Sequence, residues 1–376
     1  MSLNSALSWE QRKLSEITDK VTEKNAGLQY VETFTNSAEF GIISQRDFFD
    51  HDIAKLGSLD GYYIVKNEDF VYNPRISTSA PVGPINRNKL GRTGVMSPLY
   101  TVFRPHDIDT TYLEYFFKCG YWHSFMNFNG DSGARSDRFS IRDNVFFQMP
   151  IPIPDIDEQR KIGELLTCLD NLITLHQRKY DKLTNVKKSM LEKMFPKNGS
   201  NVPEIRFKGF TEAWEQRKLG ELVDVCSGRD YKHLSEGTIP VYGTGGYMLS
   251  VNDALSYDRD AIGIGRKGTI DRPYILKAPF WTVDTLFYAI PREKVDLNFA
   301  FDIFQNIDWK KKDESTGVPS LSKTAINDID VLAPKHDEQQ TIGQFFAALD
   351  DLITLHQREL EKLKNIKKSC LENMFV

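Results

Sequence analysis

The sequence predicts an α+β protein in which two different mixed α/β domains are separated by two long helices of repeated sequence. Residues 157–195 recur as residues 337–375, with 24 of 39 positions identical when aligned without gaps. A shorter segment, residues 9–14, returns as residues 214–219. The stretches between these repeats do not resemble each other. We therefore expect a pseudo-twofold internal repeat whose helices pair as an antiparallel coiled coil.

Composition excludes several classes of protein. The chain has 376 residues, 40% hydrophobic and 27% charged, and no apolar run long enough to span a membrane. No basic segment followed by an apolar core begins the chain, which argues against a secretory signal and favours the cytoplasm. The four cysteines lack the C-x-x-C spacing of a zinc site and fit a reduced compartment. The net charge of −4 argues against a uniformly basic surface but permits one basic face.

The repeats and composition divide the chain into five segments. From the N-terminus we expect a first domain, a central helix, a linker, a second domain and a C-terminal helix, at residues 1–150, 151–196, 197–212, 213–333 and 334–376.

Apolar residues in both long repeats recur in alternating steps of three and four, the spacing of a helix with one apolar seam. Prolines and then acidic residues precede each run, and Phe195-Pro196 ends the first. About 37 residues give a rod of roughly 55 Å, and two such rods on one chain can bury each other's seams. The predicted seam comprises Ile162, Leu169, His176, Leu183, Met190, Ile342, Leu349, His356, Leu363 and Cys370.

Two histidines occupy seam positions where the pattern calls for an apolar residue. We interpret His176 and His356 as polar seam residues that fix register and orientation, with a catalytic pair as the alternative. The charged residues of these helices are interpreted as a solvated face that could instead bind a partner protein; they include Arg178, Lys187, Lys188 and Glu192.

The two inserts differ in sequence but predict the same order of elements. In the first we expect strands at residues 61–65, 70–72 and 99–103 and a helix at 112–117. In the second we expect strands at 238–242, 261–264 and 280–283 and a helix at 299–304.

Both inserts gather side chains suited to DNA. Arginine and asparagine can read base edges, whereas lysine and glycine backbone amides suit phosphate. The candidates in the first insert are Arg46, Tyr72, Asn73, Arg75, Arg135 and Arg138. Those in the second are Thr244, Tyr247, Arg266, Lys267, Arg272, Ser320 and Lys323. Composition alone leaves this role open, because any domain of this size carries such residues.

Two glycine-rich segments imitate nucleotide-binding motifs. Residues 263–268 match G-x-G-x-x-G, but Pro273 blocks the helix that a dinucleotide site needs, so we expect strand, basic turn and strand. Residues 243–246 are interpreted as a tight turn without the lysine of a P-loop. Since H-x-x-x-H, G-x-S-x-G and the methyltransferase Asn/Asp-Pro-Pro-Tyr/Phe motif are absent from the sequence, we expect no catalytic and no metal-binding residue.

Taken together, the layout resembles the specificity subunit of type I restriction-modification systems. Four phrases of the repeated frame carry the resemblance: residues 203–210 leading into 214–222, 152–154, 157–162 and 185–190. Within the inserts, residues 71–75, 97–100, 263–268 and 281–286 look like that family's target-recognition domains. The phrases cover nearly the whole chain in the family's order.

The resemblance implies that each domain reads one half of a split site in double-stranded DNA. It implies that the helices set the gap between half-sites and bind two methyltransferase subunits, and that restriction subunits can join. S-adenosylmethionine, ATP and Mg would then be bound by partner subunits and none by this chain, which contributes no catalytic residue. The alternatives are a coiled-coil interaction scaffold whose inserts bind proteins and an enzyme that binds nucleotide at the glycine-rich turns.

Overall fold

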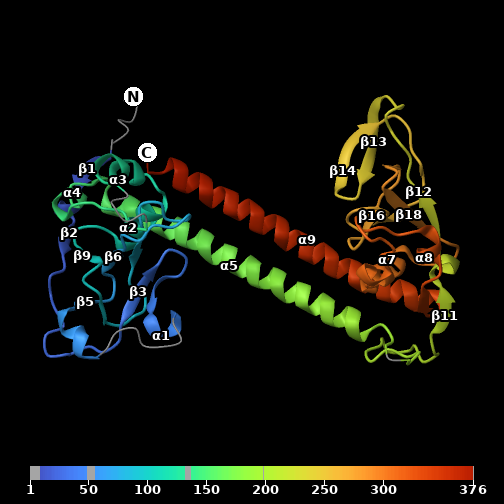
Figure 1. Cartoon of the computed structure of the whole chain (residues 1–376), viewed down its shortest axis with the longest axis horizontal. Helices are drawn as coiled ribbons and strands as arrows, with labels where there is room; N and C mark the ends of the chain where they lie inside the picture. Colours follow the sequence, from blue (N-terminus) through green and yellow to red (C-terminus); the bar gives the residue numbers. More distant parts are fainter. Residues whose placement is uncertain (1–8, 49–55, 132–136, 198, 376) are drawn as a thin grey trace, which may run out of the picture. The chain divides into compact units, whose positions relative to one another are not determined.

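The structure is a computed structural model that describes residues 9–48, 56–131, 137–197 and 199–375 (Figure 1). The candidate Arg135 lies outside these residues. The chain forms two compact units: residues 1–175 with 360–376 make the first, and residues 176–359 make the second. Each long helix therefore contributes one part to each unit.

The long helices are α5 (Ile156–Lys193) and α9 (His336–Asn373), of 38 residues each. Acidic side chains occupy the first turn of both, where they complement the helix dipole. Both helices begin inside the predicted segments. Strand β10 (Pro150–Ile153) overlaps the segment predicted for the central helix, whereas β19 (Asp330–Ala333) lies in the predicted second domain.

The first two strands of the first unit are β1 (Glu10–Lys13) and β2 (Thr18–Lys20). The remaining strands are β3 (Phe34–Ser37), β4 (Gly41–Ser44), β5 (Tyr63–Val65), β6 (Phe70–Tyr72), β7 (Ile85–Arg87), β8 (Gly94–Met96) and β9 (Thr101–Pro105). The helices are α1 (Gln45–Phe48), α2 (Thr110–Lys118), α3 (His123–Asn129) and α4 (Asp143–Phe146), with short 3-10 turns at Leu14–Glu16 and Leu56–Gly61.

In the second unit, strands β11 (Glu215–Lys218) and β12 (Val223–Ser227) flank the short helix α6 (Leu219–Leu222). The other strands are β13 (Glu236–Gly243), β14 (Gly246–Val251), β15 (Ala261–Gly265), β16 (Tyr274–Leu276), β17 (Trp281–Thr282) and β18 (Leu286–Pro291). Helices α7 (Leu297–Asn306) and α8 (Lys323–Asn327) follow, with a 3-10 turn at Trp309–Lys312 between them. All the strands and both helices predicted in the inserts are present.

Both units contain a four-stranded antiparallel sheet of the same order. It runs β2-β9-β6-β7 in the first unit and β12-β18-β15-β16 in the second. Each unit also closes its insert with a two-stranded sheet, β1 with β10 and β11 with β19. The short sequence repeat therefore marks a strand that pairs with the residues directly before a long helix.

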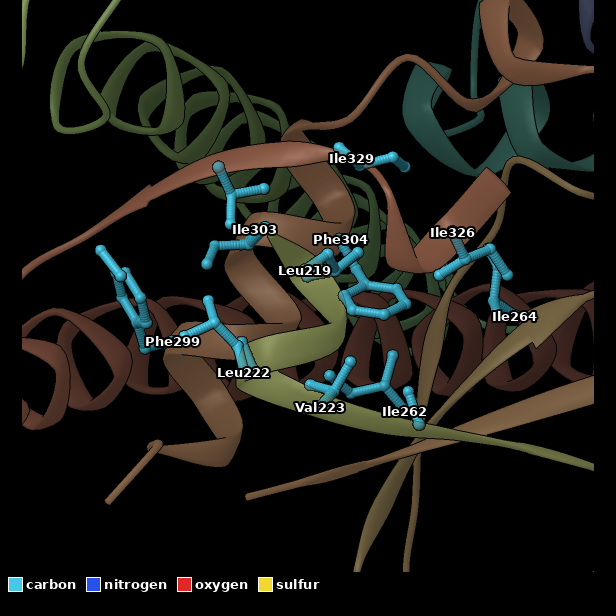
Figure 2. Packing of buried hydrophobic residues seen from close by; sticks show 14 of the residues in the cluster. Leu219, Leu222, Val223, Ile262, Ile264, Phe299, Ile303, Phe304, Ile326 and Ile329 are labelled. Carbon is cyan, nitrogen blue, oxygen red and sulfur yellow. The ribbon is translucent and has the colours of Figure 1, made fainter. Parts of the chain in front are cut away.

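Apolar side chains from the sheet and from α7 meet in the core of the second unit. Figure 2 shows Ile262 and Ile264 of β15 facing Phe304 of α7, with Leu219 and Val223 beside them. The long helices contribute to the same cluster through Leu183, Met190, Ile342 and Leu349, which are predicted seam residues. The core of the first unit likewise includes Ile162, Leu169, Leu363 and Cys370.

Polar residues join α5 to α9 within each unit. In the second unit, Nδ1 of His176 lies 3.1 Å from Nδ1 of His356. Lys187 pairs with Asp350 at 2.5 Å, and its side chain is only 12% exposed. The prediction of a solvated Lys187 is therefore wrong, because this lysine points toward the other long helix. In the first unit Lys367 makes the equivalent pair with Asp170 at 2.5 Å.

Two glycines let the insert helices approach the long helices closely. A Cβ on Gly163 would lie 3.1 Å from Cγ2 of Thr111, in α2. A Cβ on Gly343 would lie 2.3 Å from Oδ1 of Asp296 and 2.8 Å from the backbone N of Phe299, in α7. The second contact leaves no room for a side chain. In the described part of the chain, no helix is long and apolar enough to cross a membrane.

Candidate nucleic-acid interface

In the second unit, the basic turn after β15 pairs with the loop before α8. The amide of Leu321 donates to the carbonyl of Arg266 at 2.9 Å, and the amide of Gly268 donates to the carbonyl of Pro319 at 2.9 Å. Lys267 and Ser320 form the bridge between these bonds. We call the two loop segments joined by these bonds a ridge. Three predicted site residues, Arg266, Lys267 and Ser320, therefore lie on one ridge. As predicted, residues 263–268 belong to a strand and turn that lead to the antiparallel strand β16.

The first unit builds the same ridge from different residues. The amide of Phe139 donates to the carbonyl of Pro74 at 2.7 Å, and that of Ile76 to the carbonyl of Asp137 at 3.1 Å. Arg75 and Arg138 form the bridge between them. We call residues 74–76 with 137–139 the first paired loop, and residues 266–268 with 319–321 the second paired loop.

The hydrogen-bond register gives a residue-by-residue correspondence between the paired loops. Arg75 corresponds to Lys267, and Arg138 corresponds to Ser320. The two paired loops thus have the same backbone frame and different side chains. The residue-by-residue match was not predicted from the sequence, because the two inserts differ in sequence.

Local hydrogen bonds hold each paired loop in shape. Asp313 accepts from the amide and hydroxyl of Ser315, at 3.0 and 2.8 Å, and from the amide of Ser320, at 2.9 Å. These bonds, above all the one from the Ser320 amide, hold the pKa of Asp313 below its ordinary value. In the first unit, Asn73 Oδ1 accepts from the amide of Arg75 at 3.0 Å. Both ridges are therefore preorganised.

The basic side chains of the paired loops differ from Arg87, Arg92 and Arg104 of the first insert, because they have no carboxylate partner within the described residues. Within the described residues, none of the basic side chains of the paired loops makes an ion pair; these are Arg75, Arg138, Arg266 and Lys267. Arg87, Arg92 and Arg104 instead pair with carboxylates of the first unit, at 2.6–2.8 Å. The ridge cations keep their charge available for an anion such as a DNA phosphate, or for a guanine edge.

Contacts with an aromatic ring and a backbone carbonyl also orient the side chain of Arg266. Its guanidinium carbon lies 5.7 Å from the ring centre of Phe287, and its Nη1 donates to the carbonyl of Asp284 at 3.4 Å. The side chain is otherwise exposed. It is therefore oriented without being neutralised.

Two candidates of the first insert have structural roles. Tyr72 is 3% exposed, stacks on Phe146, and donates its hydroxyl to the carbonyl of Val82 at 2.9 Å. Burial raises its pKa far above the ordinary value. Its side chain belongs mainly to the core but also forms part of the lining of a hollow beside the first paired loop, so a DNA contact by Tyr72 stays a prediction. Asn73 uses its amide within the domain, where Nδ2 also donates to the carbonyl of Asn36 at 2.8 Å.

The remaining candidates belong to segments other than the paired loops. Thr244 and Tyr247 lie at the turn between β13 and β14, which confirms the tight turn expected there. Tyr247 is exposed, with its hydroxyl 3.2 Å from Ser250 Oγ. Exposed Arg272 precedes β16, Lys323 begins α8, and Arg46 lies in α1, where its charge acts on Glu32.

A hollow of about 510 Å³ lies beside the first paired loop. Arg138 and Phe139 form part of its lining, together with Tyr63, Leu99 and Tyr100. Leu99 is exposed. Of these lining residues only Arg138 was a candidate; Tyr63, Leu99, Tyr100 and Phe139 were missed, although residues 97–100 already looked like part of a target-recognition domain.

These observations define a class of protein in which one scaffold presents two different basic ridges on two domains. The family described as type I restriction modification DNA specificity domain matches residues 7–185 and again residues 211–365, and the chain belongs to this family.

Two relatives show the similarity in sequence. The type I restriction enzyme MjaVIII specificity subunit of Methanocaldococcus jannaschii is 24% identical over 267 residues, which cover 60% of this chain and 61% of the relative. The putative MjaX specificity subunit of the same organism is 24% identical over 260 residues, covering 62% and 60%. The matched region thus spans about three fifths of the length of each relative.

Solved structures share the fold. The crystal structure of a type I restriction-modification S subunit from M. genitalium has a TM-score of 0.63 at 17% identity, covering 100% of this chain and 98% of that one. A chain from a study of complex assembly and conformational transition in the type I R-M system has a TM-score of 0.50 at 12% identity, covering 100% and 99%. At these identities the likeness concerns the fold alone.

Proposed function

We propose that this chain is the DNA sequence-specificity subunit of a type I restriction-modification complex. Each insert domain reads one half of a bipartite site in double-stranded DNA, mainly through its paired loop. The observation that supports this most is the recurrence of one backbone ridge in two inserts of different sequence, with cations that have no carboxylate partner among the residues the structure describes. One scaffold with two side-chain sets is what two different half-sites require.

The decisive experiment is methylome sequencing of cells with and without this chain. We expect a bipartite adenine-methylated motif to disappear on deletion and to return when the chain is restored. Exchanging residues 17–150 for the insert of another family member should change one half-site and keep both the other half-site and the gap. An unchanged set of methylated motifs on deletion contradicts the proposed function.

The long helices are proposed to form an antiparallel coiled coil that sets the gap between the half-sites. The burial of seam residues in both units and the two Lys–Asp pairs support this pairing. One heptad added to each helix, at the level of His176 and His356, keeps the seam in phase and lengthens each rod by about 10 Å. The methylated motif should then have a longer gap, and an unchanged gap contradicts this role.

Outward-facing leucines of the long helices are proposed to bind two methyltransferase subunits. Leu172 and Leu175 on α5 and their repeats, Leu352 and Leu355 on α9, are 37–51% exposed. Exposed apolar side chains at repeated positions suit two copies of one partner. Lysine at Leu352 and Leu355 should reduce the complex from two methyltransferases to one in native mass spectrometry. The matched Leu172 and Leu175 double variant should do the same, and two bound copies in both contradict this interface.

In this proposal the chain supplies recognition and the partners supply chemistry. S-adenosylmethionine binds to the methyltransferase subunits, while ATP and Mg belong with restriction subunits that join the complex. The cytoplasm is the proposed compartment.

A further inference from the structure

A buried carboxyl group in the second unit has one oxygen without a hydrogen-bond partner. Asp302 on α7 is 1% exposed, and its Oδ2 has no hydrogen-bond partner. Leaving an ionised carboxylate in this position is costly, because nothing replaces the water it has lost. The group therefore requires an explanation that its own helix does not provide.

The charged groups that act on Asp302 come from both long helices. They are Lys187 of α5 and Asp350 of α9, with Asp296 at the start of α7 as a third. Lys187 Nζ contacts both oxygens of Asp350, at 2.5 and 2.6 Å, and forms no ion pair with Asp302. Lys187 also lies 5.9 Å from the ring centre of Phe301, next to Asp302 in α7. One lysine thus serves a site that holds two carboxyl groups.

The first unit shows how the same position is used when its side chain can donate. Helix α2 corresponds to α7: Asp109 and Asp296 cap them, and Trp122 and Trp309 each donate to the carbonyl five residues earlier. By this correspondence, Tyr115 occupies in α2 the position that Asp302 occupies in α7.

The hydroxyl of Tyr115 donates to Oδ2 of Asp170 at 2.8 Å, and Asp170 pairs with Lys367. Lys367 also lies 5.8 Å from the ring centre of Tyr115. The first unit therefore contains a lysine, a carboxylate and a hydroxyl donor. The second contains the same lysine and carboxylate, with Asp302 in place of the hydroxyl.

We propose that Asp302 is a protonated carboxylic acid that donates its hydrogen to Asp350, and so positions the second insert domain on the long helices as Tyr115 positions the first. Its role depends on keeping the proton, whereas the tyrosine hydroxyl keeps its hydrogen throughout the neutral range. The inference does not depend on what the insert domains bind.

The pH dependence has a definite sign. Burial raises the pKa of Asp302 well above its ordinary value, and the Asp350 charge acts in the same direction, against Lys187. The folded protein then keeps a proton that the unfolded chain releases above about pH 4. Its contribution to stability is full below about pH 4 and is lost as the pH rises through the folded-state pKa.

The test compares the full chain with three single variants, Asp302→Asn, Asp350→Asn and Tyr115→Phe, between pH 5 and 9. Hydrogen exchange, corrected for the intrinsic rate, reports protection of α7 and α2 separately. In the unmodified chain we expect α7 protection to fall several-fold with rising pH while α2 protection stays constant. Asp302→Asn, which is uncharged at every pH, should remove the fall. Tyr115→Phe should weaken α2 equally at every pH.

A second measurement reads the proton directly. The infrared C=O stretch of a protonated carboxyl group should be present near neutral pH in the unmodified chain and absent from Asp302→Asn. Asp350→Asn removes the neighbouring negative charge, so the band and the α7 protection should be lost at a lower pH than in the unmodified chain. Absence of the band near neutral pH, or α7 protection that is flat with pH in the unmodified chain, overturns the proposal.

Discussion

The two insert domains attach to the long helices through matching contacts, although their sequences do not resemble each other. In the first unit, Gln159 of α5 accepts from the amide of Asp109 at 2.9 Å. In the second, Gln339 of α9 accepts from the amide of Asp296 at 3.2 Å. Both glutamines are buried and also donate to a proline carbonyl five residues earlier. The repeat is retained where one side chain must satisfy two buried backbone groups.

The units differ where residues face solvent or meet the linker. The paired loops keep their backbone bonds and exchange side chains, because within the described residues the basic side chains among them form no ion pair that would fix their identity. The linker also makes a buried contact in the second unit: Arg206 binds both oxygens of Glu338 at 2.7 Å. Glu158, the repeat of Glu338, makes no ion pair within the described residues of the first unit. The two units therefore share a similar backbone arrangement but differ in the ion pairs that stabilise it.

We expect the largest effect from removing the ion pair between Arg206 and Glu338, which has no equivalent among the described residues of the first unit. Arg206→Met leaves Glu338 buried without its charged partner, a change that typically costs about 3–5 kcal/mol. Urea denaturation of the full chain, with hydrogen exchange assigning the loss to each unit, measures the effect. Glu158→Gln is the matched control and should change the free energy of unfolding by less than about 0.5 kcal/mol. Equal losses from both variants would contradict the asymmetry.

The next effect compares the two glycines at which the insert helices approach the long helices. Gly343→Ala should destabilise the second unit by about 2–3 kcal/mol, because the new Cβ meets the backbone N of Phe299. Gly163→Ala meets only the Thr111 side chain, at 3.1 Å. There the roughly 1 kcal/mol helix preference of alanine offsets the crowding, so the net change should be close to zero. Thermal unfolding of both variants measures the difference between their changes in stability. Equal changes would mean that α7 shifts to make room for the new Cβ.

A smaller effect tests the roles that the proposed function gives to the two paired loops. Arg266→Ala should cost about 1–2 kcal/mol of DNA binding and relax the choice of base in one half-site only. Arg75→Ala should act on the other half-site. Binding of the complex with its methyltransferase subunits to variants of the methylated motif measures both. A uniform loss across all sequences would instead identify the mutated arginine as a phosphate contact.

The long helices and insert elements could be predicted because they depend on local pattern. Alternating apolar spacing is sufficient for α5 and α9, and Pro273 is sufficient to reject a nucleotide-binding helix after residues 263–268. The strands just before these helices were not predicted, because they form by pairing with the distant strands β1 and β11. Pairing between segments so distant in sequence leaves no local signal.

The candidate site was harder to predict because the role of a cation depends on its partner. Lys187 looks like a surface lysine in the sequence, yet its side chain pairs with Asp350. Tyr72 belongs to a phrase typical of recognition domains and is nevertheless part of the core. Arg75 and Arg138 were both candidates, but their adjacency arises from a bridge between loops more than sixty residues apart. Residue type could select candidates, and only tertiary contacts could sort them.

The smallest predicted effect concerns the histidine pair on the long helices. Burial first, and then the charges of His176 and Lys179, lower the pKa of His356 from its ordinary value of 6.5. The unfolded chain therefore binds more protons than the folded one just below that pH. This contribution to stability is present above about pH 6.5 and is lost as the pH falls through the folded-state pKa. Because water reaches the pair, the change should be a few tenths of a kcal/mol.

Replacing both His176 and His356 with leucine should remove this acid sensitivity and leave an apolar seam. Urea denaturation at pH 7.5 and 5.5 gives the difference between the unmodified chain and the double variant, in which the carboxylates common to both cancel. We expect the double variant to lose less stability between the two pH values. Equal losses of stability in both proteins would mean that protonation of the two imidazole rings does not affect the free energy of unfolding. A variant whose helices change partner or oligomeric state would instead show that the pair selects the antiparallel register.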